Sequence, residues 1–137
     1  MVDDDRRSWR EALVREHMRA ENEQRWDDVM TTLSSPRYEL VASGQVFDGD
    51  AQVREYWLRG RELVPDQRNE LIALHHGDDS VIAEFWLRGT HRGGPDATGH
   101  TFEARMVAVF EFDDTGIVCE RVYWDRQTIN EQLLGGA

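Results

Sequence analysis

The sequence predicts a single α+β domain, with helices packed on one face of a curved, antiparallel sheet. Apolar residues recur at helical spacing near the start of the chain. Strand-like runs joined by turns fill its second half, and a short helical stretch follows the last of them. A chain of 137 residues fits one domain that spans residues 1–137 and buries a hydrophobic core.

The stretch from Arg7 to about Leu33 is predicted to form a long helix of more than about 15 residues, bent near Arg25. Its apolar positions fall on two successive stripes, which consist of Trp9, Leu13, His17 and Ala20, and of Trp26, Val29, Met30 and Leu33. Pro36 marks the end of the helix, because the residue before a proline is pushed out of the helical region.

Two short strands and a second helix are expected next. Residues 38–41 and 45–47 are typical of strands around a Ser-Gly turn. Asp50 is a predicted N-cap for a helix that ends before Pro65. One face of this helix carries Val53, Tyr56, Trp57, Gly60 and Val64.

Four strands are predicted at residues 69–76, 81–90, 101–112 and 117–124. Short Gly- and Asp-rich turns join the first to the second and the third to the fourth, which indicates an antiparallel meander. The longer loop at residues 92–99 is expected to shape the rim of a pocket. Asp125 then precedes a short final helix that Gly135 terminates.

The charge pattern argues against several classes of partner. The net charge is -11, and no run of Lys and Arg opposes it, so neither nucleic acid nor an anionic membrane surface is an expected partner. No apolar run is long enough for a signal peptide or a membrane span. Cys119 is the sole cysteine, which excludes an intrachain disulfide and favours a buried thiol and a cytoplasmic location.

The order of elements and several local strings resemble the SnoaL-like branch of the nuclear transport factor two-like, or ketosteroid-isomerase-like, superfamily. The resemblance covers residues 17–135, and the last string below is the most specific. The strings are Arg37-Tyr38-Glu39-Leu40, Phe47-Asp48-Gly49, Pro65-Asp66, Glu84, Gly89-Thr90-His91-Arg92-Gly93, Thr98-Gly99-His100, Glu120-Arg121-Val122-Tyr123-Trp124-Asp125 and Gln132-Leu133-Leu134-Gly135.

This resemblance implies a cystatin-like cone of bent sheet, wrapped by N-terminal helices around one pocket and commonly assembled as a homodimer. Its relatives include polyketide cyclases, steroid isomerases, dehydratases and epoxide hydrolases, together with members that only bind. In the cyclases, an aspartate near the end of the last strand is the general acid/base, and Asp125 occupies the matching position. Membership of the fold does not fix the reaction.

Asp125 has two readings from the residues themselves. Alternation along the last strand places it on the same face as Cys119, Arg121 and Tyr123, so it lies in the pocket if that face lines one. Asp125 is equally well placed as the N-cap of the final helix, and one carboxylate can serve both roles.

Seven further residues are candidates for the wall of a mostly aromatic ligand pocket with a few polar groups. They are His17, Trp26, Tyr38, Trp57, Glu84, Arg105 and Tyr123. A histidine on an apolar stripe is also compatible with a satisfied core residue. Glu84, Glu103 and Arg105 equally fit a salt-bridge ladder on a solvent or dimer face.

Metal and cofactor sites have little support in the sequence. His75 and His76 are adjacent on a predicted strand, so their rings face opposite sides and cannot share a metal. His91 and His100 flank the Gly-rich loop as ordinary polar groups. Neither a P-loop nor a dinucleotide fingerprint is present, so no metal and no cofactor are expected.

The leading hypothesis is a cofactor-independent acid/base enzyme that acts on a small hydrophobic ligand with a carbonyl group. Asp125 would exchange the proton, and Arg105, Tyr123 or His17 would stabilise the enolate. Water chemistry on an epoxide or an alcohol is the alternative if two acids converge on Arg105. A binding or dimerisation module without turnover is the alternative from another class, and a homodimer through the outer sheet face is expected in either case.

Overall fold

The computed structural model describes residues 3–134 and confirms the α+β class. Four helices and six strands follow in the order α1 (Asp4–Asn22), α2 (Trp26–Thr31), β1 (Arg37–Leu40), β2 (Gln45–Asp48), α3 (Asp50–Leu63), β3 (Arg68–His76), β4 (Ser80–Thr90), β5 (Thr101–Phe112), β6 (Ile117–Tyr123) and α4 (Arg126–Leu133). The predicted stop at Gly135 lies outside the described residues. Within residues 3–134, no helix combines the length and the apolar composition that a bilayer span requires.

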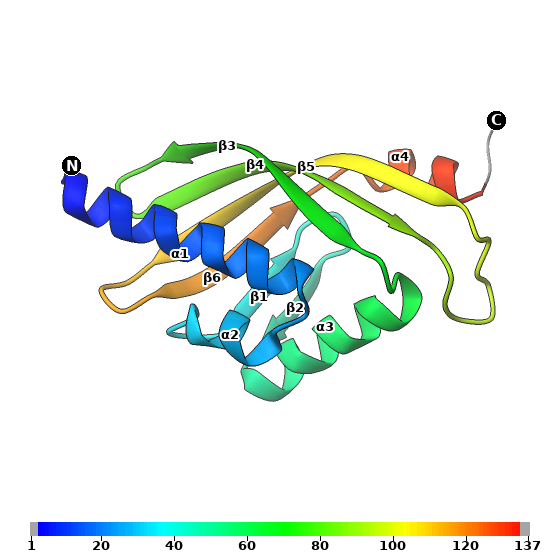
Figure 1. Ribbon diagram of the computed structural model, residues 1–137, viewed down its shortest axis with the longest axis horizontal. Coiled ribbons are helices and arrows are strands. Elements are labelled where there is room, and N and C mark those ends of the chain that lie inside the picture. The colour runs from blue at the N-terminus through cyan, green and yellow to red at the C-terminus, as the bar shows by residue number, and fades with distance from the viewer. Residues whose placement is uncertain (1–2, 135–137) are drawn as a thin grey trace.

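The six strands form one sheet in the order β2-β1-β6-β5-β4-β3. Its neighbouring strands are antiparallel except β1 and β6, which run parallel, so the sheet is mixed rather than purely antiparallel. Figure 1 shows the sheet arching over α1, α2 and α3, with α4 beside the start of β5. The fold therefore has an inner sheet face that the first three helices cover.

The predicted N-terminal helix is two helices in the structure. Helix α1 has 19 residues and is capped by Asp3, whose carboxylate accepts a hydrogen bond from the Arg6 backbone amide at 2.8 Å. It stops at Asn22 because Gln24 has a φ of 56°, a left-handed conformation that cannot continue a helix. The expected bend near Arg25 is thus a break, and α2 leaves α1 in a new direction.

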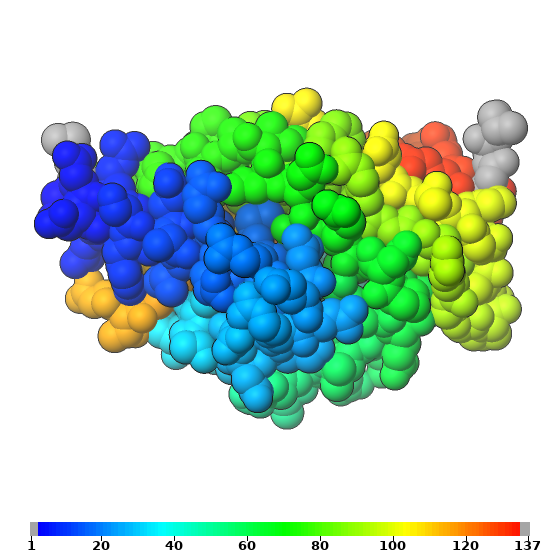
Figure 2. All heavy atoms as spheres, in the orientation of Figure 1, coloured from blue at the N-terminus to red at the C-terminus, as the bar shows by residue number. Residues whose placement is uncertain are grey.

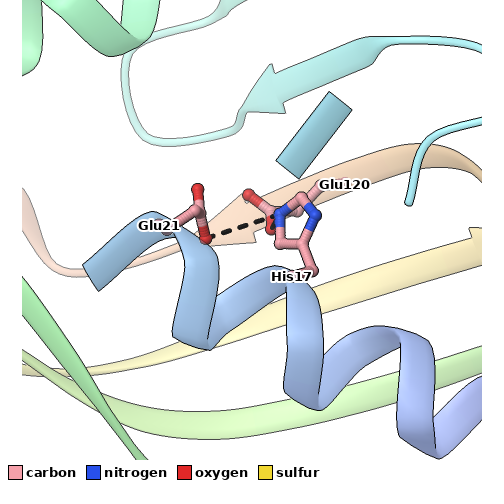
Figure 3. Close-up of side chains that lie close together, drawn as sticks. All are labelled: His17, Glu21 and Glu120. Carbon is pink, nitrogen blue, oxygen red and sulfur yellow. Dashed lines mark ion pairs between the residues drawn. The ribbon is translucent and has the colours of Figure 1, made fainter. Parts of the chain in front are cut away.

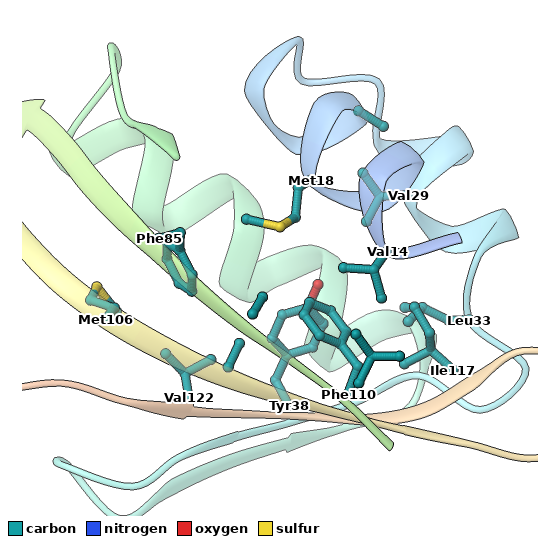
Figure 4. Close-up of a cluster of buried hydrophobic side chains, with 14 of the residues drawn as sticks. Val14, Met18, Val29, Leu33, Tyr38, Phe85, Met106, Phe110, Ile117 and Val122 are labelled. Carbon is teal, nitrogen blue, oxygen red and sulfur yellow. The ribbon is translucent and has the colours of Figure 1, made fainter. Parts of the chain in front are cut away.

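The core lies between α1 and the inner face of the sheet (Figure 4). Val14 and Met18 of α1 approach strand residues that include Phe85, Met106 and Phe110. Each of these side chains is buried, and full burial of such a side chain stabilises the fold by roughly 1.5–3 kcal/mol. The pattern along β5 shows the same division, since its alternate residues from Phe102 to Phe112 are all buried.

The outer face of the sheet carries charged groups among apolar ones. Arg88 pairs with Glu70 and Glu103, and its guanidinium lies over the Trp86 ring. Arg121 pairs with Glu39 on the same face. The homodimer expected through this face stays a prediction.

Candidate functional site

A cluster of polar side chains lies inside the core, where α1 crosses β6. His17 is completely buried, and its Nε2 lies 3.1 Å from Glu120 Oε1 and 3.4 Å from Glu21 Oε1. Figure 3 shows the two α1 residues facing Glu120 on β6. Tyr38 completes the group, because its hydroxyl lies 3.0 Å from His17 Nε2 and 3.3 Å from Glu21 Oε2.

Simple geometry brings these four residues together. His17 and Glu21 are four residues apart on α1, so they lie on one face of the helix. Glu120 is the direct neighbour of Tyr38 across the β1–β6 pair and of Phe110 across the β5–β6 pair, so all three side chains point to the inner face. The parallel pairing of β1 with β6 therefore places Tyr38 next to Glu120.

Thr32 fixes the tautomer of His17. Its hydroxyl donates to the Val29 carbonyl at 2.6 Å, so Thr32 Oγ1 must act as the acceptor toward His17 Nδ1, which lies 2.8 Å away. The proton of a neutral His17 is therefore on Nδ1, and the lone pair of Nε2 faces the two glutamates and Tyr38. One arrangement satisfies every group: protonated Glu120 donates to His17 Nε2, and Tyr38 donates to an ionised Glu21.

Burial sets the protonation of the cluster. It raises the pKa of Glu21 to about 7, while the charges of His17 and Arg61 act in the opposite direction. It also raises the pKa of Glu120 to about 8, and it lowers the pKa of His17. Near neutral pH the site therefore holds a neutral imidazole and two carboxyl groups close to their midpoints, which can both take up and release protons.

Two small cavities adjoin the cluster, each with a volume of about 60 Å³. Glu21, Tyr56, Arg61 and Gln67 line both of them. Glu120 lines the one that also borders the apolar strand residues. Figure 2 shows the atoms of α1, α2 and α3 on one outer face of the molecule. Both cavities are small by the standard of ligand sites, which usually enclose about 300–1,000 Å³.

Four of the predicted site residues do meet here. Besides His17 and Tyr38, the rings of Trp26 and Trp57 stack at 5.3 Å, and both tryptophans line the cavity that does not reach Glu120. Trp57 also contacts the Tyr38 ring edge-on at 6.0 Å. The prediction was a pocket between the first helix and the sheet with Trp26, Tyr38 or Trp57 in its wall. The cavity lined by Trp26 and Trp57 has no strand residue in its lining, and the cavity between α1 and the sheet is lined by none of the three.

The placement of Glu84, Arg105 and Tyr123 in the pocket is wrong. Glu84 pairs with His75 at 3.0 Å, Arg105 lies over the Trp86 ring, and the Tyr123 hydroxyl accepts from Arg121 at 3.1 Å. These residues have the wrong strand parity for the inner face. Arg105 is exposed on the outer face and lines neither cavity, although the His75 hydrogen bond and the Arg105 charge both lower the pKa of Glu84. The structure therefore does not bring the acids of the water-chemistry hypothesis together in a pocket.

Asp125 does not face the interior either. Its carboxylate accepts hydrogen bonds from the Gln127 amide at 3.0 Å and from the Thr128 hydroxyl at 2.8 Å, and it caps α4. These hydrogen bonds lower the pKa of Asp125, which is solvent-exposed. The expected cavity position was wrong because the face of β6 that turns inward is the one that carries Glu120 and Val122.

Sequence reasoning missed three residues of the site, namely Glu21, Glu120 and Arg61. The signal for Glu21 was its i+4 spacing from His17, and the signal for Glu120 was an acid on the same strand face as Val122. Arg61 lies over the Trp26 ring at 5.4 Å and donates to the Glu21 carbonyl at 2.9 Å. No local pattern singles it out, because it stands among several other arginines and acids on α3.

His17, Glu21 and Glu120 could also hold a metal ion, since one ligand atom from each lies within 4.8 Å of the others. No local metal signature marks these residues, because they come from two distant segments. The hydrogen bonds to one another, to Tyr38 and to Thr32 already satisfy the three side chains.

The comparisons with known proteins agree with this architecture. Residues 14–120 match the family model of the SnoaL-like domain. A protein from Jannaschia sp. CCS1, described by name as a SnoaL-like polyketide cyclase, superimposes with a TM-score of 0.80 at 18% identity, over 92% of each chain. A search of curated proteins gives no match.

Two other solved structures extend the likeness. A protein from Xanthomonas campestris pv. campestris, named as a polyketide cyclase, has a TM-score of 0.76 at 25% identity over 89% of this chain and 94% of its own. A ketosteroid isomerase-like protein from Catenulispora acidiphila, solved in complex with trimethylamine, has a TM-score of 0.77 at 16% identity, with 88% and 91% covered. With a family model matched over most of its length, the chain belongs to the SnoaL-like domain family.

Proposed function

We propose that this chain is an acid/base enzyme that removes and returns a proton next to the carbonyl group of a small hydrophobic ligand. The observation that carries the proposal is that Glu21 and Glu120, which converge on buried His17, both line one cavity. Catalytic carboxyl groups work best when their pKa lies near the working pH, and burial brings both of these groups there.

The two glutamates are suited to different steps. Glu21 has the lower pKa of the two, and the Tyr38 hydroxyl and the charge of Arg61 favour its ionised form, so Glu21 is the base that accepts the proton. Glu120 is more often protonated, and when a ligand enters, its proton turns from His17 Nε2 to the carbonyl oxygen as negative charge develops there. Arg61 lines the same cavity and adds positive charge that favours the enolate.

The test follows hydrogen–deuterium exchange of acetone in D₂O by proton NMR, since proton removal beside a carbonyl is the step common to cyclisation and isomerisation. Glu21→Gln and Glu120→Gln should each slow the catalysed exchange about 100- to 10,000-fold. Asp125→Asn should leave it within about twofold of the parent, because that carboxylate is exposed. The proposal fails if the parent gives no exchange above buffer, or if Asp125→Asn alone abolishes it.

A second candidate is the binding of a small organic cation without turnover. Two carboxyl groups line a cavity of about 60 Å³, which suits a ligand of only a few heavy atoms. The Catenulispora acidiphila relative was solved with such a ligand, trimethylamine. Calorimetry that shows trimethylammonium binding to the parent and not to Glu120→Gln, together with no exchange of acetone, would select this candidate instead.

A further inference from the structure

The buried cluster places one imidazole nitrogen and two carboxylates within reach of a single ion. One ligand atom from each of His17, Glu21 and Glu120 lies within 4.8 Å of the others, and within residues 3–134 no other three His, Cys, Asp or Glu side chains meet in this way. His17 has no exposed surface, and only 9% of the Glu120 side chain is exposed. The group therefore differs from the solvated acids that cover the surface of this chain.

The separations between the ligand atoms are close to those of a tetrahedral metal site. Zinc binds nitrogen and carboxylate oxygen at about 2.0–2.2 Å, so two ligand atoms of a tetrahedral site lie about 3.3–3.6 Å apart. His17 Nε2 lies 3.4 Å from Glu21 Oε1 and 3.1 Å from Glu120 Oε1. An ion between the three atoms would replace the contacts that now link them.

Two neighbours orient these ligand atoms from outside the cluster. Thr32 accepts the proton of His17 Nδ1, which leaves the lone pair of Nε2 for an ion. The Tyr38 hydroxyl contacts Oε2 of Glu21 at 3.3 Å, whereas Oε1 is the oxygen beside His17. Histidines and carboxylates that bind metals usually have such partners, which fix the tautomer and aim the ligand atom.

A cavity beside the cluster can supply the fourth ligand. Glu21 and Glu120 both line the cavity of about 60 Å³ between α1 and the sheet. A cavity needs only about 10–15 Å³ to hold a water molecule, so water fits here. Three protein ligands and one water are the usual set of an open zinc site. The side chain of Glu21 is 17% exposed, so solvent reaches one of the ligands directly.

The ligand set selects the class of ion. Calcium takes about six to eight oxygen ligands, and magnesium prefers an octahedron of oxygens that includes several waters. An imidazole nitrogen suits zinc and other divalent transition metals instead. Two ionised carboxylates would also place two negative charges in the interior, which is costly without a partner, and a dication neutralises both.

We propose that His17, Glu21 and Glu120 form a binding site for a divalent transition-metal ion such as Zn²⁺. The ligands are His17 Nε2 and one oxygen of each glutamate, and a water in the cavity completes a four-coordinate site. This inference does not rest on the proposed function. A bound ion occupies the carboxylates that proton transfer needs, so the ion-bound and proton-exchanging forms of the cluster exclude each other.

The test is calorimetry of chelator-treated protein with ZnCl₂ near neutral pH, in which the parent should bind one Zn²⁺ per chain. Glu21→Gln and Glu120→Gln each remove a ligand and keep its size, so each should weaken binding about 100-fold or more. Thr32→Val should weaken it about 10- to 100-fold, the usual effect of losing a partner of a metal-bound histidine. His75→Gln is the matched control, because His75 pairs with a single acid, Glu84, on the outer face. It should keep the parent dissociation constant.

Cobalt tests the geometry without any substitution. Four-coordinate Co²⁺ absorbs visible light much more strongly than the octahedral ion in water, so the chelator-treated parent should gain an intense band with CoCl₂. Glu120→Gln, checked for folding by circular dichroism, should lack this band, and His75→Gln should retain it. An octahedral spectrum in the parent overturns the proposal.

Three results of the calorimetry would also overturn the metal site. They are a parent that does not bind Zn²⁺, binding that both glutamate variants leave unchanged, and binding that His75→Gln weakens as much as they do. Acetone exchange by the chelator-treated parent keeps this outcome apart from that of the proposed function. Zinc bound by the three residues without any exchange leaves the metal site and removes the acid/base role, and exchange without zinc binding does the reverse.

Discussion

Single residues decide the chemistry of this molecule through their position rather than their type. Asp125 and Glu120 are both acids near the end of β6, five positions apart. One lies in water, where three hydrogen bonds lower its pKa, and the other lies beside His17, where burial raises its pKa to about 8. Side chains alternate between the two faces of an extended strand, so two residues an odd number of positions apart point to opposite faces. Glu120 therefore points inward, whereas Asp125 points outward and caps α4.

A substitution of Thr32 tests this dependence on single residues. Thr32→Val keeps the shape but removes the acceptor of His17 Nδ1, so a buried N–H is left unpaired and the Nε2 tautomer gains population. We expect a loss of about 1–3 kcal/mol in the free energy of unfolding, measured in urea. Nitrogen-15 NMR of the His17 ring should show a single Nδ1–H tautomer in the parent.

Thr32→Ser is the matched control, because its hydroxyl can still donate to the Val29 carbonyl and accept from His17. It should keep the parent tautomer. An unchanged NMR spectrum in Thr32→Val would show that Thr32 does not set the tautomer.

At the scale of elements, backbone hydrogen bonds hold the long loop after β4 against the end of α3, and Gly93 allows this close approach. The backbone amides of Arg92 and Gly93 both donate to the Leu63 carbonyl, at 3.1 and 3.0 Å. A Cβ on Gly93 would stand 1.6 Å from the Glu62 carbonyl oxygen, so the loop could not keep this approach. The loop that the sequence placed at a pocket rim is thus held against the helix that carries Tyr56 and Gly60.

Gly93→Ala should therefore lower the free energy of unfolding by about 1–3 kcal/mol, in the range of mutations that overpack or strain a backbone. Gly60→Ala is the contrasting substitution, because open space surrounds its Cβ and alanine favours the helix. It should be neutral or stabilising by up to about 1 kcal/mol. Thermal unfolding of the two variants checks the pair, and equal melting temperatures would contradict the close contact at Gly93.

Most helices and strands could be predicted from the sequence, because residues close together in the chain determine them. Periodicity and turn residues placed β3, β4, β5 and β6 within about one residue of their bounds. The break between α1 and α2 was not predicted, since it depends on a left-handed Gln24, a residue type that rarely adopts that conformation. Gly49, rather than Asp50, is the N-cap of α3, so the predicted cap is one residue late.

The site was harder to predict, because it depends on contacts between segments that are far apart in the sequence. His17, Trp26, Tyr38 and Trp57 were found from helical stripes and a family string. Which face of β6 turns inward depends on its pairing with β1, some 80 residues earlier, and alternation alone cannot decide it. That undecided face is the reason Glu120 was missed and Asp125 was favoured.

At the scale of the whole molecule, the buried acids link stability to pH. The pKa values of Glu21 and Glu120 are raised to about 7 and about 8, so the folded state holds protons that the unfolded state has released. Their contribution is present at lower pH and is lost as the pH rises through these values. The pKa of His17 is lowered, so its contribution to the free energy of unfolding increases with pH instead. That increase ends near pH 6.5, the ordinary pKa of histidine.

The free energy of unfolding should therefore fall between pH 6.5 and about 8.5, at up to about 1.4 kcal/mol per pH unit for each proton. Urea unfolding at several pH values measures the slope. Glu120→Gln should remove the part of the slope that belongs to Glu120, whereas Asp125→Asn should not change it, because its lowered pKa titrates far below this window. Stability that rises with pH across the window would show that the glutamates are ionised in the fold.

The crossing of α1 with β6 also has a consequence for how the molecule acquires its chemistry. His17 and Glu120 meet across about 100 positions of sequence, and the strand that carries Glu120 is the last to be synthesised. Contacts of such long range form late, after the entropy of closing a large loop has been overcome. A nascent chain that has made α1 through β5 thus has every aromatic ring of the pocket but no second acid. The buried pair of acids is therefore completed in one step, when the final strand docks between two strands that are already in place.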